Sequence, residues 1–180
     1  MLVVGAGGRE HSLALAASHD PGVGAVHVAP GNPGTAAFAT NHPVDIMDGP
    51  AVAALATSIG ADLVIVGPEA PLVAGVADDV RAAGIACFGP SRAAAQLEGS
   101  KAFAKKVMAD AQVPTAQSRV ATTPAQAAAA LDEFGAPYVV KDDGLAAGKG
   151  VIVTSDRAAA LAHAAECDQV VIEEYLDGPE

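Results

Sequence analysis

Residues 139–153 have the sequence Val-Val-Lys-Asp-Asp-Gly-Leu-Ala-Ala-Gly-Lys-Gly-Val-Ile-Val. Two β-branched apolar runs flank a glycine-rich loop, a pattern that predicts two strands joined as a hairpin. The loop is longer than the roughly two residues that a tight hairpin needs. Glycines let backbone N–H groups approach phosphate oxygens closely. A flexible hairpin with two solvated lysines would explain the glycines alone. Because Lys141 leaves an apolar strand directly into the loop, where it adds a positive charge, we favour a phosphate-binding loop.

The first half of the chain alternates short apolar runs with helical stretches. This alternation predicts right-handed βαβ units and a doubly wound parallel sheet of the α/β class. Each expected strand ends in a loop rich in Gly or Pro, and such loops gather at the sheet edge where open α/β sheets bind ligands. The strands are expected at residues 2–4, 25–29, 63–66 and 85–88, and the helices at residues 10–18, 51–59 and 73–83.

The pattern then changes to that of an α+β unit with an antiparallel strand pair. We place the division near residues 98–113, with a first domain over residues 1–98 and an incomplete second domain over residues 99–180. The second domain offers too few strands for a stable sheet, so we expect the natural protein to continue. Helices are expected at residues 91–97, before the division, and at 101–111, 124–134 and 156–166 after it, and strands at 138–141, 151–154 and 169–173.

Composition excludes several classes of protein. Hydrophobic residues make up 51% of the chain and aromatic residues only 3%, so a core must be built from Ala, Val, Leu and Ile. The net charge of −11 argues against a nucleic-acid surface. No apolar run is long enough to cross a bilayer, and the N-terminal run lacks the features of a signal peptide. Cys87 and Cys167 show no metal-ligand spacing and are expected to be buried thiols of a cytoplasmic protein.

The loop after the first strand contains Gly7, Gly8 and Arg9. It lacks the third glycine of a dinucleotide-binding fingerprint, because Glu10 occupies that position, and the second strand is not followed by a ribose-binding acid. The loop can still bind an anion through amides at a helix N-terminus and a forked contact from Arg9. A tight turn with a solvated Arg9 is an equally good interpretation of this loop alone.

Two further loops fall on the same sheet edge. Asn32 and Glu69 could form hydrogen bonds to hydroxyl groups or an amine, although turn chemistry alone would explain Asn32. In the second domain, residues 173–176 follow an apolar strand, and their backbone groups could pair with the edge of a purine. Taken by itself, that segment is more simply a strand end with solvated acids.

Taken together, ordered sequence blocks resemble the phosphoribosylamine–glycine ligase family, an ATP-grasp family of purine biosynthesis. The resemblance covers the whole chain, through residues 7–11, 29–35, 66–72, 88–91, 96–105, 144–150 and 173–178. It implies a doubly wound pre-ATP-grasp domain followed by the first part of an α+β ATP-grasp domain. It also implies a reaction in which ATP phosphorylates glycine and the amine of 5-phosphoribosylamine attacks the acyl phosphate. The products would be glycinamide ribonucleotide, ADP and phosphate.

The resemblance also assigns site residues. The ATP-binding set would be Lys101, Lys141, Gly144, Ala147, Gly148, Lys149, Gly150, Glu173, Glu174, Leu176 and Glu180. The set that faces phosphoribosylamine would be Gly7, Gly8, Arg9, Glu10, Asn32, Gly34, Thr35, Pro68 and Glu69. No catalytic nucleophile is expected, because phosphoryl transfer depends on positioning and charge neutralisation.

The metal, Mg or Mn, would be held by residues beyond 180, so no metal ligand is expected in this chain. We therefore expect residues 1–180 to be inactive alone and the complete enzyme to be a cytoplasmic monomer that binds neither nucleic acid nor membrane. Two alternatives remain at this stage: a non-catalytic nucleotide-binding module, or another ATP-grasp ligase of the purine pathway.

Overall fold

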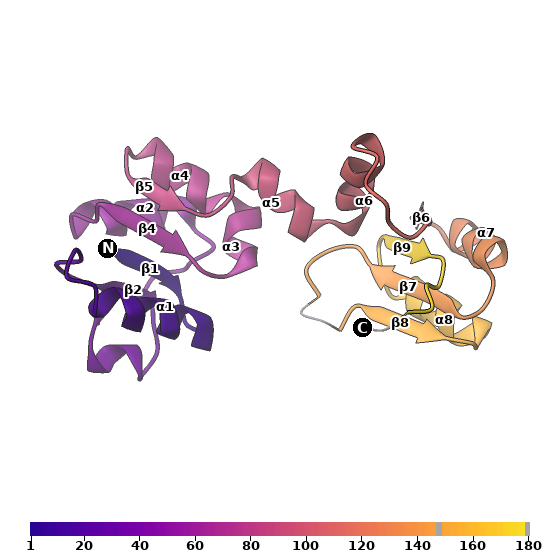
Figure 1. Ribbon diagram of the computed structural model, residues 1–180, viewed down its shortest axis with the longest axis horizontal. Coiled ribbons are helices and arrows are strands. Elements are labelled where there is room, and N and C mark those ends of the chain that lie inside the picture. Colours follow the sequence, from indigo (N-terminus) through magenta and orange to yellow (C-terminus); the bar gives the residue numbers. More distant parts are fainter. Residues whose placement is uncertain (147–148, 179–180) are drawn as a thin grey trace. The chain divides into compact units, whose positions relative to one another are not determined.

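The computed structural model describes residues 1–146 and 149–178. The chain divides into two compact units, Met1–Ala95 and Gln96–Glu180, and helix α5 (Arg92–Gly99) contains the division (Figure 1). The site expectations for Ala147, Gly148 and Glu180 lie outside the described residues. Within the described ranges, no helix is long and apolar enough to cross a membrane.

The first unit is built on a five-stranded sheet with the order β3-β2-β1-β4-β5, in which every neighbouring pair is parallel. The chain moves outward from β1 in both directions, which confirms the predicted doubly wound fold. The switch point lies between β1 and β4, and open α/β sheets bind ligands at such points. The strands are β1 (Leu2–Gly5), β2 (His27–Pro30), β3 (Thr40–Asn41), β4 (Leu63–Val66) and β5 (Ala86–Phe88).

Helices cover both faces of this sheet. Leu2 and Val4 pack into the larger cluster, whereas Val3 points the other way and packs with Ala14 of α1. Burial of both faces explains why β1 is a continuous apolar run rather than an alternating one. The helical elements are α1 (Gly8–Ser18), the 3-10 turn η1 (Thr35–Ala37), α2 (Gly49–Ser58), α3 (Glu69–Ala74) and α4 (Val76–Ala82).

The first unit differs from the expectations at two places. The single helix expected over residues 73–83 is two helices, because Gly75 adopts a left-handed conformation with φ 99° and interrupts the helical path between α3 and α4. The edge strand β3 was not predicted, since its two residues carry no periodic signal.

The second unit contains a four-stranded antiparallel sheet with the order β6-β9-β7-β8. The expected hairpin is confirmed, with Val139 opposite Val153. Strand β6 was not predicted because its sequence, Ser-Arg-Val-Ala, is half polar. The inference of too few strands for a sheet is therefore wrong. The elements are α6 (Lys101–Asp110), β6 (Ser118–Ala121), α7 (Pro124–Phe134), β7 (Tyr138–Asp142), β8 (Val151–Thr154), α8 (Arg157–Ala165) and β9 (Val170–Glu173).

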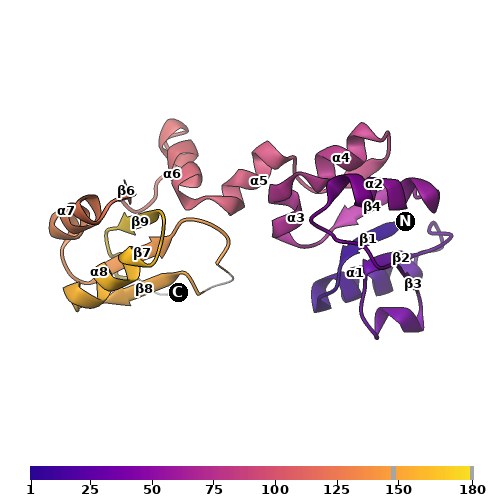
Figure 2. The same cartoon turned by 180° about the vertical axis from the view of Figure 1, so that it is seen from behind.

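One face of this sheet carries the core of the unit. Helices α7 and α8 pack on it, and Figure 2 shows these two helices beside β7, β8 and β9 from behind. Val140, Ile172 and Leu131 are fully or almost fully buried there. Val153, on the neighbouring strand, remains 54% exposed, so it lies outside that core.

We predict that Val140→Ala destabilises the second unit by about 2 kcal/mol, because two buried methyl groups are lost and a cavity remains. The matched control, Val153→Ala on the adjacent strand, should change the free energy of unfolding by less than about 1 kcal/mol. Urea unfolding of the two variants, followed by circular dichroism, measures both values. Equal losses would show that the burial pattern of this sheet is misassigned.

Candidate functional site

The glycine loop of the second unit is fixed to helix α6 by the carboxylate of Asp143. Its Oδ1 accepts from the Ala102 amide at 3.0 Å, and its Oδ2 accepts from the Ser100 hydroxyl at 3.0 Å and from the Gln169 side chain. Ser100 is also the N-cap of α6, since its Oγ accepts from the Phe103 amide at 3.0 Å. The anionic side chain thus satisfies one amide donor at a helix N-terminus, where negative charge is stabilised.

Lys101, the first residue of α6, reaches the opening of the same loop. Its Nζ donates to the carbonyl oxygen of Asp142 at 2.7 Å and to that of Gly144 at 2.9 Å. This predicted phosphate lysine therefore braces the backbone at the start of the loop.

Lys141 contacts the carboxylate of Glu173, the first residue of the segment predicted to pair with adenine. Its Nζ lies 2.8 Å from Glu173 Oε2, and Lys105 Nζ lies 3.0 Å from Glu173 Oε1. The interpretation of Glu173 as a solvated acid is therefore wrong: the side chain is buried between two lysines. Lys105 was not predicted as a site residue. Its spacing of four residues from Lys101 places both on one helix face, which is the sequence signal that could have identified it.

These groups surround a cavity of about 340 Å³, a size typical of small-molecule sites. Apolar side chains and cations share its wall, so it can accept an apolar ring together with anionic groups. The lining residues are Leu97, Lys101, Ala104, Lys105, Met108, Thr115, Lys141, Val151 and Glu173.

The other predicted ATP-binding residues are distributed around the loop and the end of β9. Gly150 is buried, and a Cβ there would lie 2.5 Å from the Cβ of Ala146, so this position requires glycine. Lys149 and Leu176 are exposed. Glu174 extends the β6–β9 pairing: its amide donates to the Gln117 carbonyl at 3.0 Å, and its carboxylate accepts from the Gln117 amide at 2.7 Å.

In the first unit, the predicted substrate residues meet at the switch point through a buried carboxylate. Glu10 Oε2 accepts from the Gly7 amide at 2.8 Å, and its Oε1 accepts from Arg9 Nε at 2.9 Å. Arg9 Nη1 then donates to Glu69 Oε1 at 2.9 Å. Arg9 is half-exposed yet paired on two sides, so the interpretation as a simply solvated arginine is wrong.

The electrostatics of this group follow from that chain of contacts. The hydrogen bond from Arg9 is the main reason why the pKa of Glu69 is lowered. Reciprocally, the hydrogen bonds to Glu69 and Glu10 raise the pKa of Arg9. One cation between two carboxylates gives the group a net charge of −1. A phosphate that binds Arg9 would therefore meet repulsion from the two carboxylates.

Asn32 shapes the neighbouring loop, as turn chemistry alone would predict. Its Oδ1 accepts from the Gly34 amide at 2.8 Å and from the Thr35 amide at 3.0 Å, and its Nδ2 donates to the Ala6 carbonyl at 3.0 Å. The last bond joins the loop after β2 to the loop after β1. Thr35 is completely buried, and Pro68 is the N-cap residue of α3. The structure therefore brings the predicted substrate residues to one sheet edge.

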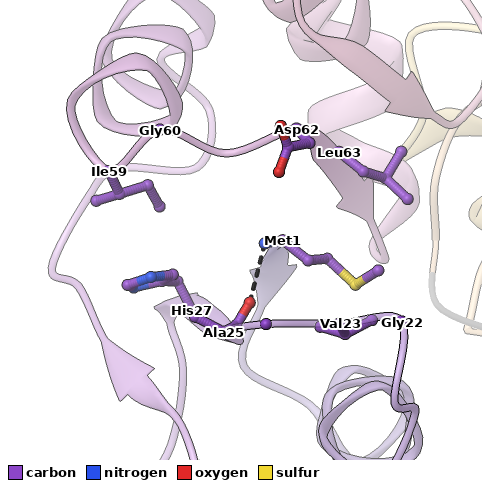
Figure 3. A pocket seen from close by; sticks show the side chains of 10 residues that line it. Met1, Gly22, Val23, Ala25, His27, Ile59, Gly60, Asp62 and Leu63 are labelled. Atoms are coloured by element: carbon purple, nitrogen blue, oxygen red, sulfur yellow. Dashed lines mark hydrogen bonds between the residues drawn. The ribbon is translucent and has the colours of Figure 1, made fainter.

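A second cavity, of about 270 Å³, lies at the opposite edge of the same sheet (Figure 3). Met1, His27 and Leu63 line it at the amino ends of their strands, and the Met1 amine donates to the Ala25 carbonyl at 3.0 Å. Burial and the neighbouring His42 lower the pKa of His27. None of the predicted site residues lines this cavity, so it is separate from the candidate sites.

We predict that Gly67→Ala disturbs the Glu10 cluster. A Cβ on Gly67 would lie 2.3 Å from Glu10 Oε1, and the buried carboxylate cannot move without weakening its bonds to Gly7 and Arg9. The cost in unfolding free energy should be about 1–3 kcal/mol. Gly24→Ala is the control, since a Cβ there meets nothing within 4 Å. Thermal unfolding of both variants measures the difference, and equal stability would contradict this steric account.

Comparison with known proteins agrees with the two-unit organisation. The family model described as phosphoribosylglycinamide synthetase, N domain, matches residues 1–98, and the model for the ATP-grasp (A) domain of the same family matches residues 99–180. A phosphoribosylamine–glycine ligase of Streptomyces coelicolor is 67% identical over the whole chain, and one of Mycobacterium tuberculosis is 58% identical. The chain spans only 43% and 45% of the lengths of these two relatives.

Solved structures support the same fold. The phosphoribosylamine–glycine ligase of Thermotoga maritima matches 99% of the chain with a TM-score of 0.79 and 29% identity, over 44% of its own length. N5-carboxyaminoimidazole ribonucleotide synthetase of Thermus thermophilus matches 98% of the chain and 47% of its own length, with a TM-score of 0.77. Its 16% identity supports the shared fold alone. These matches confirm the resemblance seen in the sequence: the chain belongs to the phosphoribosylglycinamide synthetase family.

Proposed function

We propose that the full-length protein is an ATP-dependent carbon–nitrogen ligase that joins glycine to 5-phosphoribosylamine. The reaction would pass through glycyl phosphate and give glycinamide ribonucleotide, ADP and phosphate. The observation that carries this proposal is the cavity beside the glycine loop, where Lys101 and Lys141 meet an apolar wall. The names of the relatives support the choice of substrates.

In this proposal the second unit binds ATP. Lys101 and Lys141 would neutralise phosphate charge, and the loop that starts at Gly144 would lie over the phosphates. The main chain of residues 173–176 would pair with the adenine edge. The chemistry needs no protein nucleophile, because the phosphoryl group is transferred by alignment and charge stabilisation.

A divalent cation, Mg or Mn, would accompany ATP and neutralise charge on its phosphates. The part of the chain that the structure describes contains no group of three or more His, Cys, Asp and Glu residues that could hold such an ion. The expectation that its ligands follow residue 180 remains a prediction.

The first unit would bind phosphoribosylamine at the carboxyl edge of its sheet. We propose that Arg9 exchanges Glu69 for the 5-phosphate, while Glu10 keeps Arg9 Nε in place. Glu69, once released, is close enough to the same position to accept from a ribose hydroxyl or the amine. A cytoplasmic location is also part of the proposal, because both cysteines are free thiols.

The overall test measures ADP release by the purified full-length protein with ATP alone and with ATP, glycine and phosphoribosylamine together. Release that requires both co-substrates supports the ligase. Binding of ATP without turnover would favour a non-catalytic nucleotide-binding module instead.

We predict that Lys141→Ala weakens ATP binding by about one to two powers of ten, because a charge-assisted contact is worth roughly 1.5–3 kcal/mol. Isothermal titration calorimetry on the full-length protein measures the dissociation constant. Lys106→Ala is the control, since Lys106 is an exposed lysine that pairs with Asp110. An unchanged ATP affinity in Lys141→Ala would exclude Lys141 from the nucleotide site.

We further predict that Arg9→Ala raises the KM for phosphoribosylamine at least tenfold and leaves the KM for ATP nearly unchanged. The reason is that Arg9 lies at the switch point of the first unit, whereas the lysine cavity belongs to the second unit. Arg119→Ala removes another half-exposed arginine with one carboxylate partner, and it should change neither constant. A rise in the KM for ATP with Arg9→Ala would contradict the assignment.

A further inference from the structure

Lys105 projects from helix α6 into the wall of the lysine cavity, and its charge is almost completely surrounded by protein. The side chain is only 12% exposed. Its Nζ donates to Glu173 Oε1 at 3.0 Å, to Thr115 Oγ1 at 2.9 Å and to the Ala116 carbonyl at 2.8 Å. An ammonium group has three N–H donors, so these three acceptors use all of them. Lys105 is therefore unsuited to hold a ligand directly.

Glu173 connects Lys105 to Lys141. Its side chain is only 8% exposed, and its second oxygen lies 2.8 Å from Lys141 Nζ. Strand β9 lies between β6 and β7, so the backbone that carries Glu173 is paired on both sides. The carboxylate therefore has a fixed place, with one oxygen bound to each lysine.

Lys141 is the most accessible of the three side chains, with 29% exposure, and it lines the cavity. Two lysines and one glutamate sum to a charge of +1. If Lys105 were neutral, the remaining Lys141–Glu173 pair would sum to zero, and the attraction of Lys141 for an anion would be cancelled by the adjacent carboxylate. Because the pair is partly buried, solvent screens that cancellation less than it would at the surface.

We propose that Lys105 is a positioning residue of the nucleotide site. It fixes and neutralises Glu173, so that Lys141 is held in one place by a carboxylate and still presents net positive charge to a phosphate. Lys105 itself does not touch the nucleotide. The proposal depends on the ATP site proposed above. It adds to that site a residue whose charge acts on the phosphates through Glu173 and Lys141.

The test compares ATP and adenosine binding to the full-length protein by calorimetry. Lys105→Met should weaken ATP binding about tenfold and leave adenosine binding within about twofold, because only the phosphates respond to the lost charge. Lys105→Arg, which keeps the charge, should stay within about threefold of the parent protein for ATP. Lys106→Met, the adjacent exposed lysine, should change neither affinity.

A second variant separates charge from structure. Adding Glu173→Gln to Lys105→Met removes the acid that cancels the charge of Lys141, so the double variant should bind ATP more tightly than Lys105→Met alone.

If Lys105→Met does not fold, Lys105→Gln replaces it, since the side-chain amide can still donate to Thr115 and Ala116 but carries no charge.

The outcomes are distinct. A folded Lys105→Met or Lys105→Gln variant with unchanged ATP affinity, or with equal losses for ATP and adenosine, would overturn the positioning role while the proposed function stands. Further loss in the double variant would overturn it too. Failure of the parent protein to bind ATP would overturn the proposed function and, with it, this inference.

Discussion

The carboxylate of Asp143 is the interaction on which the lysine cavity depends. It joins the end of β7 to the first turn of α6 through the Ser100 hydroxyl and the Ala102 amide. Lys141 belongs to β7, whereas Lys101 and Lys105 belong to α6. The distance between these lysines is therefore set by a helix N-terminus bonded to a single acid. Because a partly buried carboxylate that loses its donors is costly, the glycine loop and the helix are held as one piece.

In the first unit, a buried glutamate, Glu10, holds the loop after β1 and Arg9 in place. Glu10 lies against Gly5, Gly7 and Gly67, and any side chain at Gly5 or Gly67 would collide with it. The glycines at and after the ends of β1 and β4 thus make room for a carboxylate inside the switch point. The amide of Gly7, expected to bind a ligand anion, is bonded to Glu10 instead. The glycine-rich sequence of this loop therefore accommodates an internal anion.

The charged groups of the two units therefore have opposite net charges. In the first, one arginine lies between two acids, so the local charge is negative. In the second, one acid lies between two lysines, so the local charge is positive before any ligand arrives. The protein carries a formal charge of −11, and local arrangement rather than overall charge decides where an anion can bind.

The sequence by itself determined the fold class, the parallel sheet, the β7–β8 hairpin and the family, because each depends on local periodicity or on ordered motifs. It could not predict β6, whose half-polar sequence becomes a strand only through pairing with β9. It could not predict the break at Gly75, because a glycine within a helical pattern is compatible with either outcome.

Among the candidate site residues, the motifs pointed to Arg9, Lys101 and Lys141, but only the tertiary structure decided their partners. Lys105 and Glu173 are 68 positions apart in the sequence, and the packing of α6 beside β9 brings them to 3.0 Å. Glu10 likewise gained its role only where β1 and β4 lie side by side. Sequence specifies which charges a chain carries, whereas the partner that neutralises each buried charge is fixed by long-range packing, since burial makes an unpaired charge too costly to leave.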